Sequence, residues 1–323
     1  MALGSSDSVV LKKFRAQFDR MKDRTLAWIV IVWPAYGWPV EDVRRAAEVW
    51  RSRASTREQR RNTLWLSYDL AMNAGRPQEA LALTTEWADI TDNPRDYLHT
   101  RIVDGIYWDG DSSAARDAAK QLVRWADAPL APAGKLRDQH YADICVLEQW
   151  RLHQGDVRTT AQAIARLRSV HQPATEKEFV AFRCALMLEA WSATLRKSPE
   201  APHRTAQLDS LLKTGPPGWF DTQHANLLAS RLYEMQGNRP GALAAIRRRN
   251  IFANGPTAYL SAYLREEGRL SALIGDRIRA ARAYQHYLAL RADPEPSLKP
   301  QVEEVRAELA KISGESAGNG RAP

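Results

Sequence analysis

Apolar residues recur at helical spacing along the chain, most clearly close to its end. Leu298, Val302, Val305, Leu309 and Ile312 follow one another in steps of four and three residues, which puts them in one stripe on an α-helix. Elsewhere β-branched residues are sparse and Ala, Leu, Arg and Glu are plentiful, so helix is favoured over sheet. The pattern predicts an all-α protein that ends in an amphipathic helix over 297–312.

A short motif recurs between the amphipathic stretches. It consists of a glycine, a polar residue and a helix start with an alanine about five positions after the glycine. The intervals between its copies are about 35, 45, 82 and 38 residues, and periods of 35 to 45 are typical of stacked helix pairs. The glycines are Gly75, Gly110, Gly155, Gly237 and Gly275. Because the long interval is about two periods, we expect a degenerate turn near Lys197-Ser198-Pro199.

Each part of the motif has a physical role at a helix–turn–helix junction. Glycine adopts positive φ and ends the first helix, and the Asp or Asn that follows caps the second helix. Pro77 and Pro240 fall in the first turn of the second helix, where proline is tolerated. The small alanine lets the two helices approach closely.

The unit around Gly275 resembles the tetratricopeptide repeat (TPR). The resemblance rests on Gly268, Gly275-Asp276, Ala280, Tyr284, Leu288 and Pro294. The last third of the chain is also similar to repeats that follow the kinase domain in a group of bacterial serine/threonine kinases. The chain itself has no glycine-rich phosphate loop, no His-Arg-Asp loop and no Asp-Phe-Gly. The resemblance implies protein binding without kinase activity.

The periodicity and the resemblance together predict a right-handed α-solenoid of antiparallel helix pairs with a C-terminal capping helix. We expect N-terminal helices that start the array over 1–56 and TPR-like repeats over 57–296. The capping helix would cover 297–312 and a disordered tail 313–323.

Charge and cysteine content change this picture little. The net charge of +8 favours acidic partners, nucleic acid or anionic lipid. However, the arginine clusters at 57–61 and 247–249 belong to no nucleic-acid motif, so nucleic acid is not favoured. Cys145 and Cys184 lie inside apolar helical patterns, and we expect buried free thiols rather than a disulfide framework.

No residue set argues for catalysis. His140 and Cys145 are the one close His/Cys pair, and no second pair completes a zinc-type set. The chain has no nucleophile elbow and no dinucleotide fingerprint. We therefore predict no enzyme activity, no metal and no cofactor.

Binding residues are predicted from the register of the repeats, because first helices line the concave face. Arg265 and Arg269 share a face in the last unit, and His224 with Arg231 occupies the preceding unit. Such cations could hold a peptide carboxylate. This is similar to the carboxylate clamp of some TPR domains, although the Lys and Asn of that clamp are missing here. The alternative is ordinary surface arginines.

The same register predicts an aromatic groove that contains Arg101, Trp108 and Trp191, with burial of both tryptophans between helices as the alternative. The predicted function is a non-catalytic scaffold or adaptor that binds a protein or peptide partner in the solenoid groove, with an acidic partner as one option. The alternatives are a regulatory or sensor module that works with a kinase or with transcription machinery, and a membrane-associated subunit. The oligomeric state stays open.

The apolar run from Leu26 to Val32 bears on localisation. Proline and glycine interrupt it from Pro34 onward, so it is shorter than the roughly 20 residues of a spanning helix. We expect a buried helix at the start of the array and a cytoplasmic protein. The alternative is membrane association through residues near Leu26 to Trp38.

Overall fold

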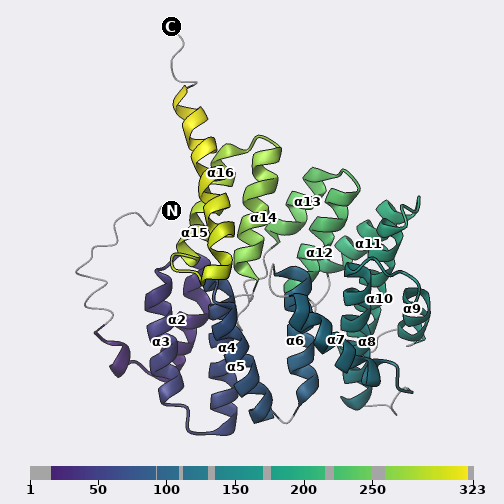
Figure 1. Cartoon of the computed structure of the whole chain (residues 1–323), viewed down its shortest axis with the longest axis horizontal. Helices are drawn as coiled ribbons and strands as arrows, with labels where there is room; N and C mark the ends of the chain where they lie inside the picture. Colours follow the sequence, from purple (N-terminus) through teal and green to yellow (C-terminus); the bar gives the residue numbers. More distant parts are fainter. Residues whose placement is uncertain are drawn as a thin grey trace. The chain divides into compact units, whose positions relative to one another are not determined.

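The chain is helical throughout its described segments. The computed structural model describes residues 16–91, 93–108, 112–129, 135–169, 176–214, 222–248 and 259–318. These segments form fifteen α-helices and three 3-10 helices, with no β-strand among them (Figure 1). The prediction of an all-α protein is confirmed. The right-handed solenoid and the TPR-like arrangement stay predictions, as does the division at residues 56, 296 and 312.

The helices belong to two compact units. One unit spans Asn93–Arg248 and contains α6 (Pro94–Tyr107), α7 (Ser112–Ala126), α8 (Lys135–His153), α9 (Thr160–Arg168), α10 (Glu176–Leu195), α11 (Ala201–Thr214), α12 (Thr222–Met235) and α13 (Arg239–Arg247). Within it, each helix packs against the next along the chain, and α6, α8, α10 and α12 also pack in succession.

The other unit joins the beginning of the chain to its end. It contains η1 (Phe18–Arg20), α2 (Asp23–Val32), η2 (Trp33–Tyr36), α3 (Val40–Ser52), α4 (Arg57–Ala74), α5 (Pro77–Thr91), α14 (Leu260–Leu273), α15 (Arg277–Leu290), η3 (Pro296–Leu298) and α16 (Lys299–Gly318). We call it the end unit, and we call Asn93–Arg248 the middle unit. The last helix, α16, covers most of the predicted 297–312 and continues past Ile312 to Gly318, while its capping role stays a prediction.

The turns inside the helix pairs follow the glycine motif. Gly75 ends α4 with φ of 76°, and its N–H donates to the carbonyls of Ala71 and Met72. Positive φ recurs at Gly155, Gly237 and Gly275. The expected degenerate turn is confirmed between α10 and α11, where Lys197 has φ of 52°. Gly110 lies outside the described residues.

The residues after each turn also act as expected. The side chain of Asp276 accepts a hydrogen bond from the Arg279 N–H at the start of α15. Asn238 does the same for the Gly241 N–H in α13. These bonds satisfy backbone donors that have no partner inside the helix.

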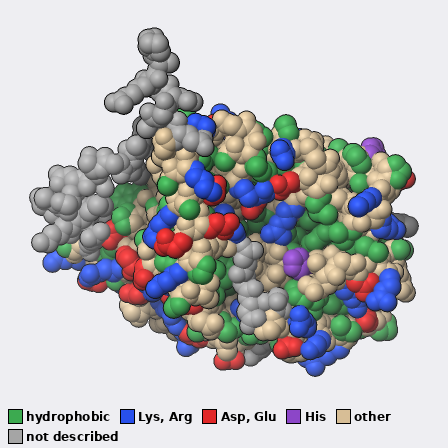
Figure 2. Space-filling view, turned by 45° about the horizontal axis from the view of Figure 1, so that its top comes forward, with side chains coloured by type: hydrophobic (Ala, Val, Ile, Leu, Met, Phe, Trp, Pro, Cys, Tyr) green, Lys and Arg blue, Asp and Glu red, His purple; other side chains and the backbone are tan. Residues whose placement is uncertain are grey.

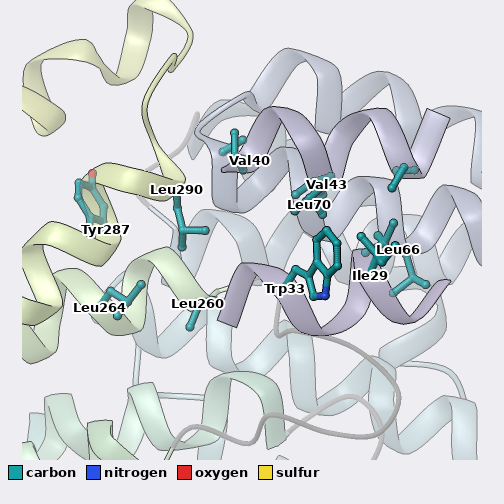
Figure 3. Close-up of a cluster of buried hydrophobic side chains, with 14 of the residues drawn as sticks. Ile29, Trp33, Val40, Val43, Leu66, Leu70, Leu260, Leu264, Tyr287 and Leu290 are labelled. Atoms are coloured by element: carbon teal, nitrogen blue, oxygen red, sulfur yellow. The ribbon is translucent and has the colours of Figure 1, made fainter. Parts of the chain in front are cut away.

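One core in the end unit is built from both ends of the chain (Figure 3). Ile29 of α2 and Trp33 of η2 lie near Leu70 of α4. Leu260 of α14 and Leu290 of α15 belong to the same core. Val302 and Val305 of α16 belong to the same cluster. Burial of these side chains joins segments that are more than two hundred residues apart in the sequence.

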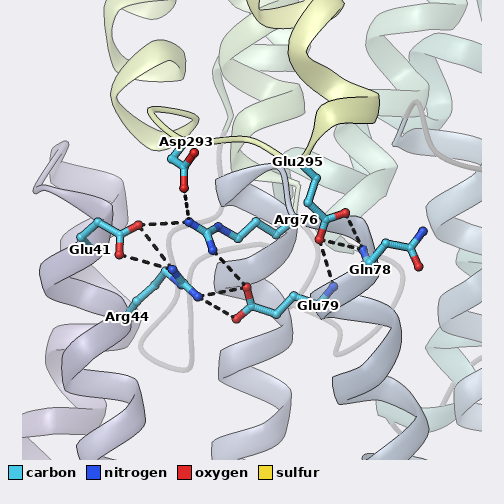
Figure 4. Close-up of polar contacts among 7 residues, drawn as sticks. All are labelled: Glu41, Arg44, Arg76, Gln78, Glu79, Asp293 and Glu295. Atoms are coloured by element: carbon cyan, nitrogen blue, oxygen red, sulfur yellow. Dashed lines mark hydrogen bonds and ion pairs between the residues drawn. The ribbon is translucent and has the colours of Figure 1, made fainter.

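A polar network supports this junction (Figure 4). Arg76 Nη2 lies 2.8 Å from Asp293 Oδ2. The carboxylate of Glu295 accepts hydrogen bonds from the Gln78 and Glu79 N–H groups at the start of α5, and the Glu295 N–H donates to the Gly75 carbonyl. The connection between α15 and α16 therefore caps α5.

The expectation of free thiols is wrong. Cys145 and Cys184 are buried as predicted, but they form a disulfide with a Cα–Cα distance of 5.8 Å. The physical reason is the packing of α8 against α10. The two cysteines are 39 residues apart, about one repeat period, so they occupy neighbouring places on successive first helices.

The apolar run near the beginning of the chain forms α2 and η2. Leu26, Ile29 and Val30 are buried in the end unit. Among the residues that the structure describes, no helix is both long enough and apolar enough to cross a membrane.

Candidate functional site

Arg265 and Arg269, the predicted clamp of the last unit, lie on α14 and pair with glutamates of this chain. Arg265 Nη2 lies 3.1 Å from Glu304 Oε2 on α16, and Arg269 Nη2 lies 2.7 Å from Glu266 Oε2. Desolvation, followed by the charges of Glu308 and Glu266, raises the pKa of the neighbouring Tyr284 to about 12. A partner's carboxylate would have to displace the existing ion pairs, so this pair is a poor candidate for a clamp.

His224, the second predicted cation of the middle unit, is an uncharged buried residue. Its side chain packs against the Tyr107 ring with 4.7 Å between ring centroids, and it is 1% exposed. Desolvation lowers the pKa of His224 to about 3. At neutral pH it therefore supplies no positive charge to a ligand.

Arg231, two turns further along α12, stays a charged and half-buried group. Its Nη1 donates to the Ile106 carbonyl over 2.8 Å, and its guanidinium lies 5.2 Å from the Tyr107 ring centroid. Ile106 is in the last turn of α6, where carbonyl oxygens lack intrahelical donors and attract cations. Among the described residues, no carboxylate forms an ion pair with Arg231.

His153 is a neighbour of Arg231 that the sequence did not indicate. It is the last residue of α8, it is exposed, and its ring centroid lies 5.8 Å from that of Trp150. Desolvation, and secondarily the charge of Arg231, lowers the pKa of His153. His153 is thus close enough to Arg231 for the two charges to interact, and we call these two residues together the Arg231 site.

Sequence register missed His153 because the contact joins distant helices. Arg231 lies six residues before Gly237. The equivalent position, six residues before Gly155, is occupied by Gln149. Gln149 is fully buried and accepts a hydrogen bond from the Tyr107 hydroxyl over 2.8 Å. His153 lies one turn beyond Gln149, and only the packing of α6, α8 and α12 brings it near Arg231.

The three remaining predicted residues lie deeper in the middle unit. Arg101 Nη1 lies 3.9 Å from Asp104 Oδ2, and the Arg101 side chain is 12% exposed. Trp108 and Trp191 are 4% and 6% exposed. Little of either tryptophan is therefore accessible to a partner. This supports the alternative that both tryptophans are buried between helices.

The middle unit also contains a buried histidine–aspartate pair. His99 Nε2 lies 2.8 Å from Asp143 Oδ1, and Arg95 Nη1 lies 3.2 Å from Asp143 Oδ2. Asp143 is 0% exposed and His99 is 2% exposed. Arg95 neutralises the Asp143 carboxylate, and the three side chains join α6 to α8, so the arrangement is that of a buried structural ion pair rather than of a site that meets substrate.

Charge on the surface is mixed. On the face shown in Figure 2, basic and acidic side chains are interspersed rather than gathered by sign. Within the described residues, no group of three or more His, Cys, Asp or Glu side chains is placed to hold a metal ion. Comparison with protein-family models, with curated proteins and with solved structures finds no match for this chain.

Proposed function

We propose that this chain is a non-catalytic interaction module of TPR type that binds an acidic protein or peptide segment at the Arg231 site. The observation that carries the proposal is the state of Arg231. Its guanidinium is held by the Ile106 carbonyl and the Tyr107 ring, yet no carboxylate of the described chain neutralises it. A partner's carboxylate would supply the missing charge.

The chemistry of the site fits a carboxylate. A guanidinium has five N–H donors in a planar fork, and the bond to Ile106 uses one nitrogen. The remaining donors can bind both oxygens of a carboxylate. His153 can add a donor when it is protonated, so the site would bind most strongly at mildly acidic pH.

The competing interpretation is that Arg231 only caps the end of α6. Under this interpretation Arg231 stabilises the middle unit and has no ligand. The regulatory role beside a kinase or transcription machinery is implied by the resemblance alone, and no described residue favours it.

The test is binding of a fluorescein-labelled oligoglutamate peptide, with oligoglutamine of equal length as the reference, followed by fluorescence polarisation. Charge-assisted hydrogen bonds are worth about 1.5–3 kcal/mol, so Arg231→Gln should weaken oligoglutamate binding by roughly ten- to a hundredfold. Arg158→Gln is the matched control, because this substitution removes the same charge from the same unit. The Arg158 side chain is 86% exposed.

Equal weakening by Arg231→Gln and Arg158→Gln would show general charge attraction and would refute the site. Loss of stability in Arg231→Gln without loss of binding would establish the capping role instead. A pH series distinguishes the contribution of His153 to the affinity from that of Arg231. Affinity should rise as the pH falls below 6.5, because the pKa of His153 is lowered from that ordinary value, and His153→Gln should abolish that rise.

A further inference from the structure

From Leu26 onward, the helix α2 and the turn η2 are apolar on all sides. No polar or charged residue occurs from Leu26 to Tyr36. One face packs into the core of the end unit through Leu26, Ile29 and Trp33. Outside this core, Trp28 of α2 is 56% exposed and Tyr36 at the end of η2 is 64% exposed.

The exposed aromatics are joined by further apolar surface. Ile31, Val32 and Ala35 lie between them and are only partly buried. A helix that is apolar all round is normally enclosed by protein or lipid. An exposed end of a helical array is normally polar. We therefore expect the exposed apolar surface of α2 and η2 to be covered by lipid or by protein.

The charge beside this face is positive. Arg20, Lys22 and Arg24 are exposed at the beginning of α2, and none forms an ion pair with a described residue. The acidic residue between them, Asp23, is paired with Arg53 at 3.3 Å, while the side chain of Asp19 is exposed. Three cations thus stand at one end of an aromatic and aliphatic stripe.

Length and composition favour a lipid surface as the occupant. The apolar stretch is about 16 Å long at 1.5 Å per residue, roughly half of the hydrocarbon thickness of a bilayer. A stretch of this length can lie in the membrane–water interface, but it cannot span the bilayer. Tryptophan and tyrosine concentrate at the headgroup level of membranes, and Lys and Arg beside them bind anionic headgroups.

We propose that α2 and η2 form a docking surface for an anionic membrane. Trp28 and Tyr36 enter the headgroup layer with Val32 between them, and Arg20, Lys22 and Arg24 contact lipid phosphates. This surface belongs to the end unit, whereas the Arg231 site belongs to the middle unit, so neither proposal depends on the other.

The experiment is co-sedimentation of the full chain with vesicles of phosphatidylcholine alone and of phosphatidylcholine with phosphatidylglycerol at three to one. Binding is expected to the anionic vesicles and to weaken with salt. The double change Trp28→Ser with Tyr36→Ser should reduce the partition coefficient at least tenfold. Each of Arg20→Gln, Lys22→Gln and Arg24→Gln should reduce it about fivefold.

A matched control uses other exposed apolar side chains of the same unit. Leu273 and Ile278, at the turn from α14 to α15, are 47% and 70% exposed. Leu273→Ser with Ile278→Ser should leave vesicle binding unchanged, and thermal unfolding should show both double variants folded.

Three results would overturn the proposal. The first is absence of binding to the anionic vesicles, and the second is an equal loss in the two double variants. The third is a dimer of the wild type in light scattering that Trp28→Ser with Tyr36→Ser dissociates, because a second copy would then be the occupant.

Discussion

Reduction of the Cys145–Cys184 disulfide is expected to destabilise the middle unit. The bond joins α8 to α10, and both cysteines are buried, at 4% and 0% exposure. Breaking it leaves the helices packed but removes a covalent constraint on the unfolded chain.

The magnitude follows from the length of the closed loop. For a separation of 39 residues, the loop-closure entropy corresponds to about 4 kcal/mol at 25 °C. For a unit of about 150 residues, this lowers Tm by roughly 8 to 16 °C. The effect should be confined to the middle unit, because both cysteines belong to it.

The assay must report on each unit separately, because two units in one chain need not unfold in a single step. Hydrogen exchange with mass spectrometry meets this need. Peptides from α8 and α10 should lose protection when reductant is added, whereas peptides from α3 and α15 should not. Cys145→Ala with Cys184→Ala is the control, since reductant should have no further effect on it.

Thiol titration gives the decisive check of the bond. In denaturant without reductant, the chain should show no reactive thiol, and after reduction it should show both. Two reactive thiols before reduction would refute the disulfide. A disulfide whose reduction leaves exchange in α8 and α10 unchanged would refute the loop-entropy argument.

Three further predictions concern single side chains. Because the folded pKa of His224 is lowered to about 3, the unfolded chain takes up a proton first as pH falls below 6.5. Stability should therefore drop by about 2 kcal/mol between pH 7 and 5, and His224→Gln should flatten that slope in urea unfolding. Gly268→Ala should destabilise by about 1–3 kcal/mol, because its Cβ would lie 2.3 Å from Tyr284. Gly314→Ala, with open space around it, should instead stabilise α16 by up to about 1 kcal/mol. Glu295→Ala should cost about 1 kcal/mol by uncapping α5, and unchanged thermal unfolding would contradict that role.

Local features of the fold were predictable because their causes are local. A glycine at positive φ ends a helix whatever surrounds it, which is why the turn at Gly275 matches its prediction. The turn near Lys197 was found from the period alone, although a lysine replaces the glycine. The stripe of α16 was predictable because it depends only on helical spacing.

The candidate site was predictable only in part. The register singled out Arg231 because it depends on helix geometry within one repeat. It paired Arg231 with His224, and it could not show that His224 packs on Tyr107 and stays uncharged. Desolvation depends on every neighbour that excludes water, and those neighbours come from other helices.

The sequence by itself determined that this protein consists of helix pairs, where their turns and caps lie, and which face of the last helix is apolar. The tertiary structure alone decided that Cys145 meets Cys184, that His153 lies beside Arg231, and that both ends of the chain share one core. The physical reason is the range of the interactions. Turns and caps involve neighbours within about five residues, whereas pairing, pKa shifts and core burial arise from segments brought together only by packing.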